Sequence, residues 1–150
     1  MNKRQKVILA KFILVTAVTA IAVVALINFK DWVNRSEAMR AMEQLGRLVI
    51  NYRQEHGAVP SKSYVQGIKE NLKGHGRLGH LVYRGIWVNL ESTPEEILAY
   101  AERNYHSLLV GKGYVVLRLS GNVEWMEKQD FEALLARQQS RQEVEMMDNG

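Results

Sequence analysis

VILAKFILVTAVTAIAVVALINF, residues 7–29, is the stretch that decides how this chain is organised. Its twenty-three residues include one charge, at Lys11, and one asparagine, and all the others are apolar or Thr. Because an α-helix rises about 1.5 Å per residue, the unbroken part from Phe12 to Phe29 would extend roughly 27 Å, close to the hydrocarbon thickness of a bilayer. We therefore predict a transmembrane helix over residues 12–29, preceded by a basic tail over residues 1–11.

Two other interpretations of the apolar segment stay open at this point. A cleaved secretory signal also begins with basic residues, and Ala20-Ile21-Ala22 supplies the small residues of a cleavage site. That site lies inside the apolar run, however, and the run exceeds the roughly 7–15 residues of a signal's hydrophobic region. The second interpretation is a helix wholly buried in a soluble protein. An uncleaved anchor accounts best for the length.

Charge indicates how the anchor is oriented. Four basic residues crowd the short N-terminal tail and its junction with the apolar segment: Lys3, Arg4, Lys6 and Lys11. Since basic residues are retained on the cytoplasmic side, we expect a cytoplasmic N-terminus and an extracytoplasmic domain made of the remaining residues. A lipid bilayer is the first partner that the sequence predicts.

The overall charge of +4 does not indicate nucleic-acid binding. All sixteen acidic residues lie after residue 30, so residues 31–150 carry fifteen Lys and Arg against sixteen Asp and Glu, a net charge of about −1. The basic character thus belongs to the membrane end, and we expect no nucleic-acid partner. The chain has no cysteine, which excludes disulfides, thiol nucleophiles and Cys-based zinc sites.

Residues 30–56 are predicted to be an amphipathic extension of the same helix. The segment has no proline, and its large apolar residues recur at intervals of three, four or seven. Gly57, with Pro60 three residues later, is the expected helix stop. The residues predicted to pack this helix on the domain are Trp32, Met39, Met42, Leu45, Val49 and Tyr52, with Trp32 also placed at the membrane interface.

Residues 57–80 are predicted to be a loop with one short helix, capped by Ser61 or Ser63. The end of this region, residues 73–80, is glycine-rich, and Gly74, Gly76 and Gly79 formally satisfy G-x-G-x-x-G. A dinucleotide site needs a strand before that motif and a helix after it. The order expected here is the reverse, so we interpret the motif as a flexible loop.

Residues 81–137 are predicted to form an antiparallel sheet and a closing helix. Residues 81–90 are predicted to be a strand and residues 97–100 a short strand or half-turn. Residues 114–119 and 123–126 are predicted to form a hairpin around Ser120-Gly121-Asn122. Asp130 is the expected cap of the closing helix, and residues 138–150 are expected to fray. The predicted fold class is α+β, a long N-terminal transmembrane and amphipathic helix on a small antiparallel sheet with a short C-terminal helix.

The C-terminal part carries a family resemblance. ILAYAERNYHSLLVGKGYVVLRLSGNVEWM, residues 97–126, is similar to the end of a bacterial group of type IV pilin-like and type II secretion pseudopilin-like proteins, and NYRQEHGAVP, residues 51–60, looks like the segment where their long helix ends. The resemblance implies a pilin-like fold, a bacterial inner-membrane location with a periplasmic domain, and a structural role. The matching positions are Ile97, Leu98, Tyr100, His106, Gly113, Val116, Gly121, Val123, Glu124 and Trp125.

This sequence departs from the family at four positions. Ser120 and Asn122 replace the hairpin's Asp and second His, so a role that needs that pair, such as ion binding, is not carried over. Lys11 and Thr16 occupy the places of the Gly and Glu by which a prepilin is recognised and processed. The departures favour an unprocessed relative that stays in the membrane.

No catalytic, metal-binding or cofactor-binding residue is predicted. The four histidines include no HExxH pattern, and the sequence has no nucleophile elbow or phosphate loop. Two functions remain open: a pseudopilin-like structural or assembly component, and a tethered accessory subunit that binds one fixed protein partner without polymerising. The first includes self-association through the membrane helix, for which the expected packing residues are Phe12, Ala17, Ala20, Ala25 and Phe29.

Overall fold

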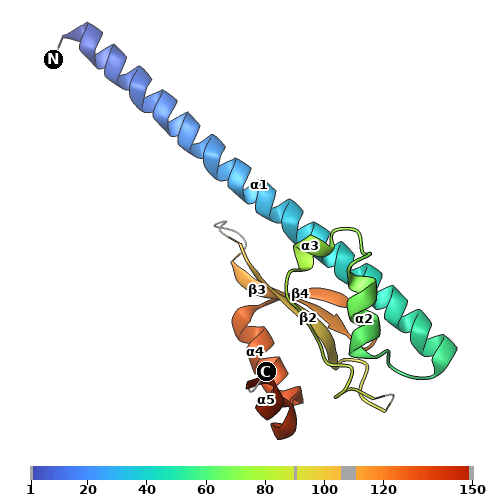
Figure 1. Ribbon diagram of the computed structural model, residues 1–150. Helices are drawn as coiled ribbons and strands as arrows, with labels where there is room; N and C mark the ends of the chain where they lie inside the picture. Colours follow the sequence, from blue (N-terminus) through green and yellow to red (C-terminus); the bar gives the residue numbers. More distant parts are fainter. Residues whose placement is uncertain (1, 90, 106–110, 149–150) are drawn as a thin grey trace.

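A single long helix dominates the structure. The computed structural model describes residues 2–89, 91–105 and 111–148. Helix α1 (Lys3–His56) runs for 54 residues without a break, and Figure 1 shows its N-terminal half projecting away from the folded domain. It ends at Gly57, which has a left-handed φ of 63° and whose N–H donates to the Arg53 carbonyl at 2.9 Å. The predicted continuous rod and its glycine stop are both confirmed.

Two short helices follow α1. Helix α2 (Lys62–Lys69) begins as predicted at Ser61, whose hydroxyl accepts a hydrogen bond from the Tyr64 N–H. The glycine-rich segment was expected to be irregular, but it contains the four-residue helix α3 (His75–Leu78). The reason is Leu78, which is fully buried in the core. Its burial holds this turn of the chain in contact with α1.

Four antiparallel strands form one sheet in the order β1-β2-β3-β4. They are β1 (Leu81–Tyr83), β2 (Ile97–Asn104), β3 (Lys112–Arg118) and β4 (Val123–Glu127). The hairpin between β3 and β4 is confirmed, with the Gly121 N–H donating to the Arg118 carbonyl at 2.9 Å.

The strand predicted over residues 81–90 was wrong over residues 84–89, and residue 90 lies outside the described residues. The chain turns at Arg84, whose carbonyl accepts a hydrogen bond from the Trp87 N–H at 2.8 Å. Gly85 permits this turn, because a Cβ there would lie 2.3 Å from the Tyr83 ring. The segment after β1 is therefore a connection to β2, which extends further than the short strand that was expected.

The sheet separates two layers of helix, as Figure 1 shows. Alternate residues of β3 point to opposite faces of the sheet. Val115 and Leu117 belong to the main core with α1. Val116 packs on the other face with Phe131 of helix α4 (Lys128–Gln138). Helix α1 approaches the sheet closely at Gly46, where a Cβ would lie 2.8 Å from Leu117 Cδ1. The observed fold is the α+β arrangement predicted from the sequence.

The C-terminal end differs from expectation in two ways. Helix α4 begins at Lys128 after Glu127 in the cap position, and Asp130 lies within its first turn instead of capping it. The tail expected to fray forms helix α5 (Arg141–Asp148). Glu143 holds this helix to the domain through an ion pair with Arg84.

Candidate functional site

The apolar half of α1 contributes nothing to the core. Residues 3–27 are all exposed, and the helix is long and apolar enough to span a membrane. Of the residues predicted to pack in the membrane, Phe12 and Phe29 are 69% and 63% exposed, and Ala17, Ala20 and Ala25 are exposed as well. The structure thus brings no described part of the chain against this segment.

Three polar side chains within the apolar half donate hydrogen bonds to their own helix. The hydroxyls of Thr16 and Thr19 donate to the carbonyls four residues earlier, each at 2.9 Å, and the Asn28 side-chain amide donates to the Val24 carbonyl at 3.0 Å. Such back-bonding supplies hydrogen-bond partners where no water is available. The segment is therefore chemically suited to a lipid environment.

The second half of α1 packs on the domain through a face of which the sequence predicted only some residues. Met42, Leu45 and Val49 are fully buried, Met39 is partly buried, and Tyr52 is half-buried, its ring 4.8 Å from that of Tyr64 on α2. Each of these five predicted packing positions therefore contacts the domain or its edge. The sequence reasoning missed Ala38, Ala41 and Gly46, since it counted large apolar residues only.

Trp32 does not pack on the domain, so that part of the prediction was wrong. Its side chain is 60% exposed and stacks on Phe29, with ring centroids 6.2 Å apart. The buried face of α1 is centred on Ala38, Leu45 and Val49, and Asp31 lies seven residues before Ala38 on that face. Trp32 lies about 100° further around the helix, in line with the only partly buried Met39. Trp32 keeps its predicted place just beyond the apolar segment.

Of the hairpin residues of the resembled motif, Val123 and Trp125 face α1, whereas Glu124 lies opposite Val116 on the other face of the sheet. Val123 and Trp125 pack against the main core, and the Trp125 ring lies under the Arg35 guanidinium at 4.9 Å. Glu124 is held by Arg118 on the neighbouring strand, with Nε and Oε1 2.6 Å apart. The predicted His106 lies outside the described residues.

Gly121 is required by geometry. Its φ of 91° lies in the left-handed region, and a Cβ there would lie 2.1 Å from Ile50 Cδ1 on α1. The hairpin turn therefore fits against α1 only if it carries no side chain at this position. This is a structural role for one of the motif residues.

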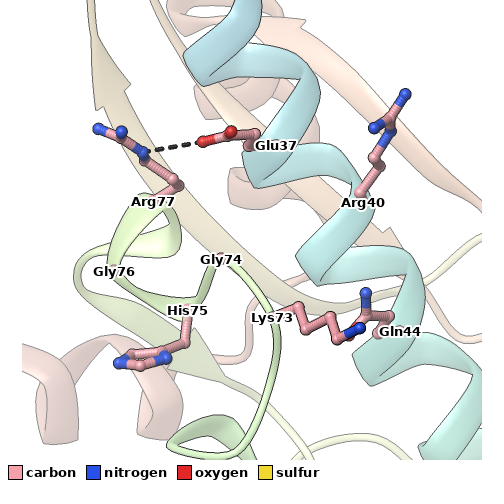
Figure 2. Close-up of a pocket in the computed structure, with 8 residues that line it drawn as sticks. All are labelled: Glu37, Arg40, Gln44, Lys73, Gly74, His75, Gly76 and Arg77. Atoms are coloured by element: carbon pink, nitrogen blue, oxygen red, sulfur yellow. Dashed lines mark hydrogen bonds and ion pairs between the residues drawn. The ribbon is translucent and has the colours of Figure 1, made fainter.

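A pocket of about 600 Å³ lies between α1 and the glycine-rich segment (Figure 2). Arg77 reaches across to Glu37 of α1, with Nε and Oε2 2.9 Å apart, and Lys73 extends toward Gln44. The His75 ring points away from α1 and lies 3.1 Å from the Leu72 carbonyl. Arg77 thus ties the segment to the helix, and the side chains of this pocket do not converge on one point.

The glycine-rich segment lacks the geometry of a dinucleotide site. Helix α2 and a turn precede Gly74, and α3 has only four residues, so neither the strand nor the long helix of that motif is present in this part of the chain. In residues 2–89, 91–105 and 111–148 no three His, Asp or Glu residues are grouped so that they could hold a metal ion.

Burial is the largest cause of the shifted pKa values of Tyr83 and Arg103. Desolvation raises the pKa of the Tyr83 hydroxyl well above its usual range, and this hydroxyl donates to the Pro60 carbonyl at 2.8 Å. Desolvation, together with the nearby Arg77, lowers the pKa of Arg103. These groups lie at opposite ends of the helix–domain contact.

In comparisons with protein families, characterised proteins and solved structures, nothing matches this chain. Its function must therefore be argued from the residues and their arrangement.

Proposed function

We propose that this protein is a non-enzymatic, pseudopilin-like membrane protein that serves as a structural or assembly component of a secretion- or pilus-type envelope system. The observation that carries the proposal is the division of α1. Its first half is apolar and uncovered, and the same helix continues unbroken into a half that packs on a four-stranded antiparallel sheet. A rigid rod of this kind fixes the domain relative to the bilayer.

The proposed location is the bacterial inner membrane, crossed once, with the N-terminus in the cytoplasm and the domain in the periplasm. The basic tail before the apolar segment supports this orientation. The proposed partners are the bilayer and other membrane or envelope proteins, including further copies of the chain that pack through the small residues Ala17, Ala20 and Ala25.

A specific observation favours a second candidate, a tethered accessory subunit that binds one fixed protein partner without polymerising. Thr16 occupies the place where the resembled family has a glutamate, and its hydroxyl bonds to the Phe12 carbonyl of its own helix. It offers no charge to a neighbouring subunit. Lys11 likewise replaces the glycine at the processing point.

Intact mass measurement of the protein extracted from its native membrane distinguishes the two candidates. A full-length chain that copurifies with different proteins supports the accessory subunit. A chain shortened near Lys11 that is recovered with many copies of itself supports the polymerising component. A chain that begins near Val23 contradicts membrane anchoring, because it identifies the apolar segment as a cleaved signal.

Membrane anchoring has its own test. The double variant Val18→Arg/Ile21→Arg places two charges in the middle of the proposed span, where each costs about 2.5–3.5 kcal/mol, and is expected to become extractable by alkaline carbonate. The matched control Ile86→Arg/Met146→Arg adds the same charges at residues 73% and 69% exposed on the domain, and is expected to stay with the membrane. Equal extraction of the two variants would contradict the anchor.

A further inference from the structure

A small basic cleft lies where α1 leaves the proposed membrane span. Its volume is about 290 Å³, and its lining includes Lys30 and Asn34 of α1, Arg77 of α3, and Arg103 at the end of β2. Water occupies about 30 Å³ per molecule in the liquid, so the cleft has room for a phosphate group with part of its hydration shell.

The depth of the cleft matches the headgroup layer. Lys30 and Asn34 follow Phe29 by one and five residues, which places them roughly 1.5–7.5 Å beyond the apolar segment along the helix axis. The polar layer on each side of a bilayer is about 5–7 Å thick. Exposed Trp32, stacked on Phe29, lies in the same layer.

The charge of the cleft favours an anion. Three cationic side chains line it, from Lys30, Arg77 and Arg103, against one carboxylate among the described lining residues. The Nε of Arg77 also pairs with Glu37 outside the cleft, at 2.9 Å. That carboxylate belongs to Asp31, which is 8% exposed and already engaged within the chain. The positive charges of Arg77 and Arg103 repel each other, and this repulsion contributes to the lowered pKa of Arg103. An anion bound between the two side chains would offset the repulsion.

Two hydrogen-bond donors at the wall of the cleft have no partner among the residues that the structure describes. The Arg103 Nε and the Tyr105 hydroxyl are buried and unpaired, while the other end of the Arg103 guanidinium bonds weakly to the Gly76 carbonyl at 3.4 Å. Leaving such groups unpaired costs free energy, and a phosphate presents several acceptor oxygens to donors that shift toward it.

We infer that the cleft formed by Lys30, Arg77 and Arg103 binds the phosphate of an anionic phospholipid headgroup in the leaflet next to the domain. The inference rests on the proposed membrane anchoring, because only an anchored chain holds the cleft at headgroup depth. Bound in this way, the lipid would join α1, α3 and β2 at the membrane surface and set the angle of the domain to the bilayer.

The test uses full-length protein in a mild detergent, with bound lipid counted by native mass spectrometry during titration with phosphatidylglycerol or phosphatidylcholine. The wild type is expected to retain phosphatidylglycerol in preference. A cation near an anionic membrane surface is worth about fivefold in affinity, so Arg77→Gln/Arg103→Gln should weaken phosphatidylglycerol binding about 25-fold. Lys30→Gln/Arg77→Gln, which changes two exposed side chains, serves as a second variant and should show the same loss.

Two matched controls localise the lipid. Arg47→Gln/Arg137→Gln removes two exposed cations far from the cleft and should retain wild-type binding. Arg4→Gln/Lys6→Gln should lose only lipid held by the N-terminal tail, with the preferential phosphatidylglycerol site intact. Equal retention of the two lipids, or loss of selectivity in the tail variant alone, would overturn the inference.

A third arm separates a lipid headgroup from a free ion. Inorganic phosphate at millimolar concentration should leave phosphatidylglycerol bound, and displacement by phosphate alone would assign the cleft to a soluble anion instead. Carbonate extraction of the same variants keeps the two proposals distinguishable. Variants that lose the lipid but stay in the membrane show that the cleft binds the lipid independently of the anchor. A wild type that leaves the membrane contradicts the anchor itself.

Discussion

Arg84 and Glu143 form an ion pair closed to solvent, although 59 residues separate them in the chain. Arg84 Nε lies 2.6 Å from Glu143 Oε1 and its terminal nitrogen 2.9 Å from Oε2, and both side chains are 1% exposed. The same guanidinium donates to the Ile97 and Gln138 carbonyls at 2.7 and 3.2 Å. One arginine thus joins the turn after β1, the start of β2, the end of α4 and helix α5.

Removing one partner of this pair is expected to be costly. Glu143→Ala leaves the Arg84 charge buried without its carboxylate, so the free energy of unfolding should fall by about 3–5 kcal/mol. The measurement is urea unfolding of the full chain in mild detergent, followed by tryptophan fluorescence. Val144→Ala changes a residue of the same helix that is 43% exposed, and should cost less than about 0.5 kcal/mol.

The double variant Arg84→Met/Glu143→Met tests whether the charge or the packing matters. An apolar pair of similar volume needs no charge compensation, so we expect it to recover most of the stability lost in Glu143→Ala. If the double variant is as unstable as the single one, the cost lies in the lost hydrogen bonds to the carbonyls of Ile97 and Gln138.

Gly121→Ala is expected to loosen the hairpin from α1. The new Cβ meets the Ile50 side chain at 2.1 Å and the φ of 91° disfavours alanine, so we expect a loss of about 2–4 kcal/mol in the same unfolding measurement. Adding Ile50→Val removes the closest contact and should restore part of the loss. The control Gly76→Ala meets nothing within 4 Å and has no left-handed φ, and a comparable loss there would refute the steric explanation.

Leu45 and Leu48 provide a matched pair on one helix. Leu45 is fully buried against the sheet and Leu48 is 40% exposed. Leu45→Ala should lower the free energy of unfolding by about 2–5 kcal/mol because it opens a cavity between α1 and the domain, whereas Leu48→Ala should cost less than about 1 kcal/mol. Equal effects would contradict the orientation of α1 on the sheet.

Tyr83 should make the domain sensitive to alkali. Burial raises its pKa in the folded state, so above about pH 10 the unfolded chain loses this proton while the folded chain keeps it, and the free energy of unfolding falls as pH rises. Tyr83 makes its full contribution to the free energy of unfolding below about pH 10. Above that pH the contribution declines by up to about 1.4 kcal/mol per pH unit.

Tyr83→Phe isolates that contribution. It should cost about 1–2 kcal/mol at pH 8, because the buried Pro60 carbonyl loses its donor, and should reduce the alkaline slope by one proton. Unfolding measured between pH 8 and pH 12 gives both quantities. Tyr64→Phe, at a residue 41% exposed, is the control, and an equal change of slope there would show that Tyr83 is not the responsible group.

Much of the fold follows from patterns that are local in the sequence. The length and apolarity of residues 7–29, the spacing of Met42, Leu45 and Val49, the stop at Gly57 and the hairpin around Gly121 each depend on a few neighbouring residues. The structure has all of these features. The strand predicted over residues 81–90 failed because its end is set by a turn whose glycine packs on the Tyr83 ring.

The basic cleft needed the tertiary structure. Lys30, Arg77 and Arg103 belong to three elements, and no spacing in the chain relates them. The sequence reasoning correctly found that the domain carries a net charge near zero, but a net charge does not show where individual cations gather. The packing of α3 and β2 beside α1 brings these three together.

By itself the sequence determined the long helix, its apolar and amphipathic halves, the antiparallel hairpin and the α+β class, because hydrophobic periodicity and glycine positions act over one or two turns of chain. Only the tertiary structure decided that Asp31 faces the domain while Trp32 faces outward, that the C-terminal segment folds into α5, and that Arg84 is neutralised by Glu143. The physical reason is that a buried charge must find a partner in space, and the partner that folding supplies lies far away along the chain.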